Sequence, residues 1–259
     1  PEYKRFNDSS LQVQEKEAEF SNSRWEAICE CCLKYFGRLN KLEVIDIGCG
    51  FSQALLYFRE KGMKTKGIDP SPEAVDYAMS RGLDVSHSKI EDFRCLGSAR
   101  FDAAVLINVL EHISNPAKIL LDIKEKVLKP NGLLVVDVPN DFNDFQAVAN
   151  AEFNLEQWWV CPPTHINYFS ADTLKSILVK CGYSVFYYES TFPMEIFMLM
   201  DDVYVGNSAI GQKCHQRRER FEYLMKKHGK KEQLSKLYHA LADLNIGRQI
   251  VVHAVAPGR

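Results

Sequence analysis

Short apolar segments alternate with amphipathic segments over residues 41–138, and this alternation restricts the fold more than any other feature of the chain. Each apolar segment is a continuous run of the length that suits a strand buried on both faces. Each amphipathic segment has apolar residues at helical spacing. The expected strands are KLEVIDI, KTKGID, LDVS, FDAAVLI and LLVVDV, and the expected helices between them are FSQALLYFREKG, PEAVDYAMSRG and NPAKILLDIKEKVL. The pattern predicts an α/β protein whose parallel sheet is covered on both faces and doubly wound.

Cap residues mark where several helices begin. Ser23 and Glu26 have the spacing of a capping box, and apolar residues follow at helical spacing until residue 37. Ser71 and Asn115 each precede a proline, which is the usual pairing of a cap with a first-turn residue. Ser170 is expected to cap a helix that leads into the strand YSVFYYES.

The second half of the chain is organised differently from the first. Residues 140–169 are rich in aromatic side chains and lack a clear periodicity. Residues 191–247 have a mostly helical pattern, and RQIVVHAVA forms a last strand. We therefore expect one domain with a helical insertion before its final strand.

Composition excludes several classes of protein. The chain has 32 Lys and Arg against 34 Asp and Glu, and this near balance disfavours a general binder of polyanions. No apolar run approaches the length of a membrane span. The eight cysteines follow no regular framework, and we see no signal peptide. We therefore expect reduced thiols and a cytoplasmic location.

The stretch DIGCGFSQ follows the first expected strand, at the edge of the sheet where doubly wound folds bind ligands. A dinucleotide-binding turn has the pattern G-x-G-x-x-G, and here the third glycine position is Gln53. Asp46 places a carboxylate where a pyrophosphate would be repelled. S-adenosylmethionine (SAM) instead carries a sulfonium and an ammonium. We expect SAM, with its carboxylate on the backbone amides from Gly48 to Gly50.

Other residues at the same edge agree with this cofactor. Asp69 ends the second strand in GIDPS, where it can accept hydrogen bonds from both ribose hydroxyls. The backbone at Lys89 and Ile90 in SKIEDF follows the third strand and can meet the adenine edge.

Four segments in order, VIDIGCG, GIDPS, NVLEHISNP and LKPNGLLVVDVPN, resemble class I SAM-dependent methyltransferases. PTHINYFSADTLKSILVKCGYSV is similar to the segment that ubiquinone-biosynthesis O-methyltransferases carry after strand five. The resemblance implies a Rossmann-like sheet of seven strands, the last one antiparallel, with the helical insertion between the last two strands. The cofactor contacts that we expect are Asp46, Gly48, Cys49, Gly50, Asp69, Pro70, Ser88, Lys89, Ile90 and Asn108.

On this basis we divide the chain into three regions. Residues 1–40 form an N-terminal arm and a helix that covers the cofactor site. Residues 41–190 and 248–259 form the SAM-binding core. Residues 191–247 form the insertion, which we expect to be a lid over the methyl acceptor or an oligomer contact.

Two positions depart from the pattern of the family. Ser52 replaces the third glycine of G-x-G-x-G and could cap the following helix. Asn108 replaces the carboxylate that some ubiquinone-type relatives use, beside the Glu-His pair, to hold a divalent metal. Because a neutral Asn is a poor ligand for a hard cation, we expect no metal site.

Methyl transfer from a sulfonium is an in-line displacement, so the protein positions the acceptor and removes its proton. The candidate bases are His165 and His112, because histidine titrates near neutrality. His165 could instead brace its loop, and His112 could orient Glu111 or cap a helix. The residues expected to contact the acceptor are Asn140, Trp158, Trp159 and Tyr168, although the two Trp could be core residues.

A hydroxyl oxygen is the leading acceptor and an amine nitrogen the second, because no NPPY-like segment and no cysteine nucleophile stand where base-methylating enzymes need them. KCHQRRER in the insertion is either a solvated helix face or a site for a phosphorylated, nucleotide-linked or sugar-linked metabolite. The alternatives are a nucleic-acid methyltransferase, a non-catalytic SAM-binding module and, least favoured, a NAD-dependent dehydrogenase. The expected partner is a small-molecule acceptor rather than nucleic acid, and a homodimer is left open.

Overall fold

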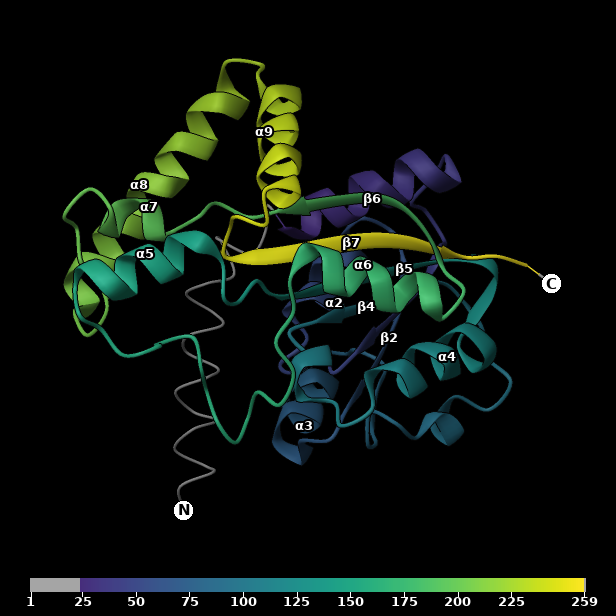
Figure 1. The fold of residues 1–259 in the computed structure, drawn as a ribbon. Helices are drawn as coiled ribbons and strands as arrows, with labels where there is room; N and C mark the ends of the chain where they lie inside the picture. The colour runs from purple at the N-terminus through teal and green to yellow at the C-terminus, as the bar shows by residue number, and fades with distance from the viewer. Residues whose placement is uncertain (1–23, 259) are drawn as a thin grey trace.

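The computed structural model describes residues 24–258, and its centre is one mixed sheet of seven strands (Figure 1). The strand order is β3-β2-β1-β4-β5-β7-β6. The bounds are β1 (Glu43–Ile47), β2 (Lys64–Asp69), β3 (Val85–His87), β4 (Phe101–Ile107), β5 (Leu128–Pro139), β6 (Ser184–Ser190) and β7 (Gln249–Ala256). Strands β1 to β5 pair in parallel, whereas β7 runs antiparallel to both β5 and β6. The predicted doubly wound sheet with an antiparallel last strand is confirmed.

Helices cover the sheet on both faces because successive strand residues point to opposite sides. In β4, Ala103 and Val105 enter a cluster with the helix of residues 24–36 and α2 (Gln53–Glu60). Ala104 and Leu106 enter a second cluster with α4 (Pro116–Lys126) and α6 (Ala171–Lys180). The remaining short elements are α3 (Pro72–Ser80), α5 (Asp144–Glu152), η1 (Phe93–Leu96) and η2 (Leu110–His112). In the described part of the chain, no helix combines the length and the apolar character that crossing a membrane requires.

Three of the predicted helix caps are confirmed. The side chain of Ser71 accepts a hydrogen bond from the amide of Ala74 in α3, and that of Asn115 accepts one from Lys118 in α4. Ser170 forms a capping box with Thr173 at the start of α6. Each such cap contributes about 1 kcal/mol to stability. The capping box predicted at Ser23 lies outside the described residues.

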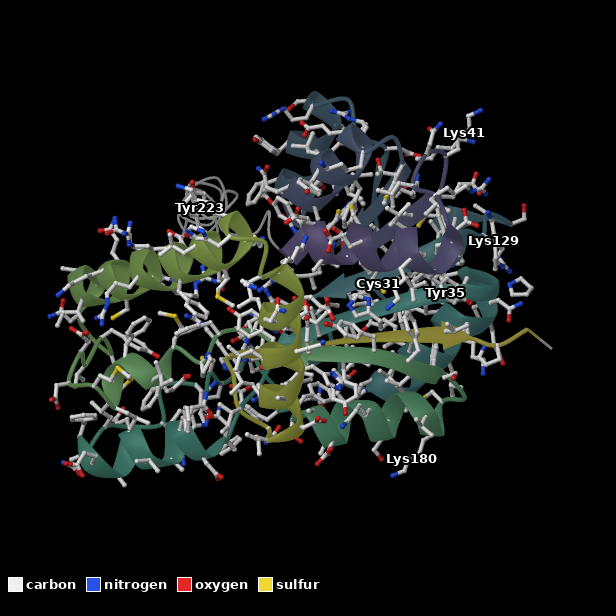
Figure 2. The ribbon with its side chains drawn as sticks, turned by 90° about the horizontal axis from the view of Figure 1, so that it is seen from above. Cys31, Tyr35, Lys41, Lys129, Lys180 and Tyr223 are labelled. Carbon is white, nitrogen blue, oxygen red and sulfur yellow. The ribbon has the colours of Figure 1, made fainter. Side chains whose placement is uncertain are left out.

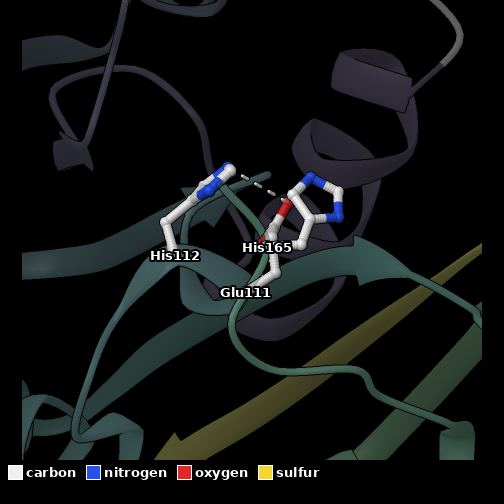
Figure 3. Close-up of side chains that lie close together, drawn as sticks. All are labelled: Glu111, His112 and His165. Atoms are coloured by element: carbon white, nitrogen blue, oxygen red, sulfur yellow. Dashed lines mark ion pairs between the residues drawn. The ribbon is translucent and has the colours of Figure 1, made fainter. Parts of the chain in front are cut away.

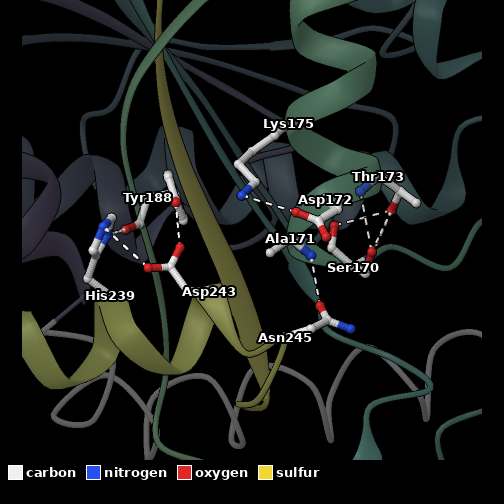
Figure 4. A network of polar contacts seen from close by, with 9 residues as sticks. All are labelled: Ser170, Ala171, Asp172, Thr173, Lys175, Tyr188, His239, Asp243 and Asn245. Atoms are coloured by element: carbon white, nitrogen blue, oxygen red, sulfur yellow. Dashed lines mark hydrogen bonds and ion pairs between the residues drawn. The ribbon is translucent and has the colours of Figure 1, made fainter.

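The insertion is helical, as predicted, and consists of α7 (Glu195–Met198), α8 (Ser208–Lys227) and α9 (Lys231–Asp243). Helix α9 returns along the edge strand β6, where His239 and Asp243 bond the backbone oxygen and the hydroxyl of Tyr188 (Figure 4). At the turn between α8 and α9, Lys226 and Lys231 lie 3.1 and 3.5 Å from the carboxylate of Glu26. The insertion is therefore fixed both to the sheet edge and to the helix of residues 24–36, which carries the labelled Cys31 and Tyr35 in Figure 2.

Helix α5 lies within residues 140–169, where the sequence lacks a clear periodicity and no helix was predicted. The helix is weakly amphipathic and buries only Gln146 and Ala149. Its start does carry a local signal, because Asn143 and Gln146 form a capping box.

A glycine on β2 permits the close approach of the first helix to the sheet. A Cβ atom at Gly67 would lie 2.7 Å from Sγ of Cys49 and 2.8 Å from Cδ1 of Leu55 in α2. In a dinucleotide-binding turn the glycine that permits this approach is the third one of the motif, where this chain has Gln53. The structure has it on the neighbouring strand, so the turn and α2 can pack directly against β2.

We expect Gly67→Ala to lower the free energy of unfolding by about 1–3 kcal/mol, because the extra methyl overpacks this contact. The matched control is Gly211→Ala in α8, where the new Cβ would meet only Tyr204 at 3.8 Å. This control should raise stability by about 0.5–1 kcal/mol, since alanine favours a helix. Urea denaturation of both variants measures the two effects, and equal effects would contradict the packing argument.

Candidate active site

The turn after β1 depends on its first glycine. Gly48 has a φ of +77°, and a Cβ atom there would lie 2.6 Å from Cγ2 of Val109 and 3.3 Å from Cδ1 of Ile90. Val109 follows β4 and Ile90 follows β3, so this glycine allows three loops to meet at the carboxyl edge of the sheet. The sequence-predicted residues Gly48 and Ile90 are thus brought together.

The backbone amides of this turn already have acceptors. The amides of Gly48 and Cys49 donate to the carbonyl oxygen of Ile68, at 2.8 and 3.2 Å. The amide of Gly50 donates to Oδ2 of Asp69 at 2.7 Å. These three donors stabilise the turn itself, and the contact of a SAM carboxylate with the amides from Gly48 to Gly50 stays a prediction.

The N-terminus of α2 offers different donors. Ser52 occupies the cap position with a φ of 61°, but its hydroxyl does not accept from the helix and instead points to Gly50 O and Cys49 Sγ, each at 3.3 Å. The predicted role of Ser52 as a side-chain cap is thus wrong. The first helical residues, Gln53 and Ala54, line the main cavity. A helix start without a side-chain cap has amides and a positive dipole end that suit a carboxylate.

Asp69 and Asp46 form the acidic part of the cofactor site. The two oxygens of Asp69 accept from Gly50 and Ser71, at 2.7 and 2.8 Å, and each oxygen keeps a further lone pair for a ribose hydroxyl. Asp46 is buried, and its Oδ1 has no hydrogen-bond partner among the described residues. Burial, with the nearby charge of Asp69, raises the pKa of Asp46 to about 7. A cationic ligand would stabilise the ionised form of Asp46, which agrees with a sulfonium cofactor.

The segment expected to meet the adenine is fixed next to Asp69 through backbone contacts. The amide of Ser88 donates to the carbonyl oxygen of Asp69 at 3.0 Å, and the Ser88 hydroxyl donates to the carbonyl of Asp92 at 2.9 Å. A ring nitrogen of His87 lies 3.0 Å from the carbonyl oxygen of Pro70. Residues 88–90 therefore border the ribose-binding position that Asp69 offers.

A polar chain crosses the opposite end of the site. Oδ1 of Asn108 accepts from Nε2 of Gln249 at 3.1 Å, and Oε1 of Gln249 accepts from Nη2 of Arg24. Nε of Arg24 lies 2.9 Å from Oδ2 of the buried Asp137, a charge contact without the alignment of a hydrogen bond. Sequence reasoning identified Asn108 but missed Arg24, Gln249 and Asp137, which no local motif marks.

A cavity of about 820 Å³ opens from this turn. Its volume is typical of a pocket for a small molecule. The walls come from the helix of residues 24–36, the first turn, the ends of β4 and β6, the start of β7, and helices α8 and α9. Representative lining residues are Arg24, Asp46, Gly48, Asn108, His215, Arg218, Tyr238 and Arg248.

The loop of residues 161–167 is held against the end of β4. The amides of Ile166 and Asn167 both donate to the carbonyl oxygen of Glu111 at 3.0 Å. This places His165 beside Glu111 and His112, with the two imidazole centroids 4.9 Å apart (Figure 3). The structure therefore brings the two predicted catalytic histidines together.

The protonation of this group follows from its contacts. Nδ1 of His112 lies 2.7 Å from the carbonyl oxygen of Thr164, so Nδ1 carries a proton and donates to this oxygen. Burial raises the pKa of Glu111 to about 7, whereas burial and the neighbouring His112 lower the pKa of His165. One ligand atom from each of the three side chains lies within 4.8 Å of the others, so the group could hold a metal ion.

These features agree with the comparisons to known proteins. The family model described as a methyltransferase domain matches residues 18–187. The chain belongs to this family. Class I SAM-dependent methyltransferase, the class predicted from the sequence, is confirmed, and SAM is the cofactor of this family.

Individual relatives of the methyltransferase are distant. The ubiquinone biosynthesis O-methyltransferase of Rickettsia canadensis (strain McKiel) is 25% identical over 150 residues, which cover 55% of this chain and 61% of that protein. That of Bradyrhizobium diazoefficiens is 33% identical over 135 residues, which cover 49% of this chain and 51% of that protein. The chain thus spans between half and two thirds of the length of these relatives.

Solved structures share the fold of this methyltransferase. A SAM-dependent methyltransferase from Archaeoglobus fulgidus aligns with a TM-score of 0.61 and 18% identity, covering 95% of this chain and 99% of that one. The [4+2]-cyclase SpnF aligns with a TM-score of 0.55 and 18% identity, covering 90% of this chain and 82% of that one.

The residues predicted to contact the acceptor lie apart from the main cavity of the methyltransferase. Trp158 and Trp159 pack edge to face at 4.7 Å, and neither they nor Tyr168 line the cavity. Asn140 is fully buried, and its side-chain nitrogen donates to the carbonyls of Asn245 and Gly247 at 3.0 and 2.9 Å. Asn140 therefore holds the backbone before β7, and its side-chain nitrogen has no hydrogen left to donate to a methyl-accepting substrate.

We expect Asp69→Ala to weaken SAM binding by about ten-fold or more, because two charge-assisted hydrogen bonds to the ribose are lost. Isothermal titration calorimetry measures the affinity. Asp76→Ala, on the exposed side of α3, is the control and should bind SAM as the wild type does. Unchanged affinity in Asp69→Ala would remove Asp69 from the cofactor site.

We also expect methyl transfer to survive dialysis against EDTA. Glu111 is the one carboxylate in the group with His112 and His165. Asn108 is neutral, and its side-chain oxygen accepts a hydrogen bond from Gln249. The measurement is the turnover rate before and after dialysis, then with added Mg²⁺ or Zn²⁺. Activity lost on dialysis and restored by either ion would show that the three side chains hold a catalytic metal.

Proposed function

We propose that this protein transfers a methyl group from SAM to a hydroxyl oxygen of a small molecule. The observation that carries the proposal is the single cavity that joins the cofactor turn to the walls formed by α8 and α9. Asp46, Gly48 and Asn108 line its cofactor end, so an acceptor in the remaining volume would lie next to the methionine half of SAM. Both relatives are named O-methyltransferases, and this supports oxygen over nitrogen as the atom that accepts the methyl group.

In this proposal the cofactor supplies a methyl group that is already activated, and the protein supplies orientation and a base. Asp69 holds the ribose, residues 88–90 meet the adenine, and the start of α2 receives the carboxylate. The helix of residues 24–36 covers the cofactor, and the insertion of residues 191–247 closes over the acceptor. His165 is the proposed base, because its lowered pKa leaves the imidazole neutral at pH 7. Like His112, it does not line the cavity, but its loop is bonded to Glu111, three residues after Asn108, which does.

His112 has the proposed role of positioning His165. Its Nδ1 is fixed by the carbonyl of Thr164, and its ring packs edge to face against that of His165. Buried Glu111 anchors the loop of His165 through its backbone oxygen. This arrangement makes His112 the second candidate for the base.

A reaction other than methyl transfer is the second candidate function, because the [4+2]-cyclase SpnF shares the fold. Incubation with SAM and a panel of hydroxylated metabolites, with S-adenosylhomocysteine as the readout, separates the two functions. A nucleic-acid substrate is less favoured, because the cavity is bounded by helices on several sides and the formal net charge is −2.

We expect His165→Ala to reduce turnover roughly 100-fold, the usual contribution of a general base, with SAM affinity unchanged. His228→Ala, at the exposed end of α8, is the control. In the wild type, turnover should be level near neutral pH and fall as acid protonates His165, at a pH below the usual 6.5 because its pKa is lowered. A loss of stability without a loss of turnover would assign His165 a structural role and pass the base to His112.

A further inference from the structure

Arg248 stands at the point where the chain re-enters the sheet from the insertion. It immediately precedes β7, its side chain is exposed, and it lines the cavity. The next residue, Gln249, bonds Asn108 at the cofactor end of the same cavity. Arg248 is therefore one residue away from the polar chain that borders the methionine half of SAM.

The other strong cations that line the cavity each have a carboxylate nearby. Arg24 contacts Asp137, Lys226 contacts Glu26, and Lys231 contacts Glu26 and Glu30. Arg218 lies 3.6 Å from Glu222. Among the residues that the structure describes, Arg248 alone of these lining cations makes no ion pair within 4.0 Å.

Two groups of α8 face the cavity beside Arg248. Burial, together with the charges of Arg248 and Arg218, lowers the pKa of His215 to about 4, so these three side chains share one electropositive region. The Nε atom of Arg218 is buried and has no hydrogen-bond partner in the described part of the chain. A buried guanidinium N–H without an acceptor is costly, and an anion would satisfy it.

The acidic residues nearby compensate Arg218, which lies 3.6 Å from Glu222 and 3.8 Å from Glu219, but among the described residues no carboxylate lies within 4.0 Å of Arg248. Glu195 interacts electrostatically with Arg248, but it is buried beyond ion-pair distance, and burial raises its pKa. Glu222 already accepts from the hydroxyl of Tyr238 at 2.8 Å. The cavity thus has an acidic end at Asp46 and a cationic end at Arg248.

We propose that Arg248, Arg218 and His215 form an anion-binding subsite that holds a phosphate or carboxylate group of the methyl acceptor. The proposal rests on the proposed function, since it takes the cavity to be the acceptor pocket. A guanidinium can bind either group in a bidentate manner, and the imidazole donates a further hydrogen bond. The anion orients the acceptor so that its hydroxyl reaches the methyl end of SAM beside Asn108.

The carboxylate of SAM is the other anion that could reach Arg248. The experiment therefore uses the full chain saturated with S-adenosylhomocysteine, which occupies the cofactor carboxylate site. Pyrophosphate, inorganic phosphate and malonate are titrated by calorimetry into the wild type, Arg248→Gln and Arg248→Lys. Arg220→Gln, on the exposed side of α8, is the matched control.

The expected result is pyrophosphate binding that weakens about ten-fold or more in Arg248→Gln and less in Arg248→Lys, because lysine keeps the charge but loses the bidentate geometry. The affinity for S-adenosylhomocysteine stays at the wild-type value. In NMR titrations the pKa of His215 rises in Arg248→Gln, because one neighbouring cation is gone, and it rises in the wild type when pyrophosphate binds.

Anion binding that is absent from the wild type, or unchanged in Arg248→Gln, would overturn the subsite. Weaker S-adenosylhomocysteine binding with an unchanged anion response would overturn it too, and would assign Arg248 to the cofactor. A wild type that fails to bind S-adenosylhomocysteine would contradict the proposed function itself, so the two failures are distinguishable.

Discussion

The side chain of Arg24 joins the helix of residues 24–36 to Asp137 at the centre of the sheet and, through Gln249, to Asn108 after β4. Asp137 is fully buried on β5, where an unpaired carboxylate would be strongly disfavoured. Removing one partner of such a pair costs about 3–5 kcal/mol, because the other charge stays buried without compensation. The same guanidinium bonds Gln249, and Gln249 bonds Asn108. Arg24, in the helix of residues 24–36, thus connects the centre of the sheet, the start of β7 and the loop after β4.

Much of the fold and of the cofactor half could be predicted because their signals are local. The continuous apolar runs predict buried strands, and Ser71, Asn115 and Ser170 mark helix starts whose caps the structure has. Asp69 could be placed at the ligand edge, since the carboxyl ends of parallel strands meet there. His112 and His165, the two histidines predicted from the sequence, lie together after β4.

The rest depends on contacts that no short pattern encodes. Arg24 and Gln249 are 225 positions apart, and neither lies in a motif. The use of the amides from Gly48 to Gly50 within the turn follows from the packing of β1 against β2, which the pattern of glycines does not reveal. The aromatic residues of the segment 158–168 were expected at the acceptor, but a sequence rich in aromatics forms a packed cluster as readily as a pocket wall.

The pairing of β7 with β5 has a consequence for how this protein can change. The chain leaves the sheet after β6 and returns beside the same point, where the amide of Thr191 donates to the carbonyl of Gln249 at 3.0 Å. The register of β7 is fixed by its two neighbours and not by the helices between. Doubling the length of such a connection costs only about 0.6 kcal/mol in closure entropy. Residues 191–247 can therefore be exchanged without changing the register of β7, and under the proposed function such an exchange would alter the choice of acceptor while the cofactor-binding half stays intact.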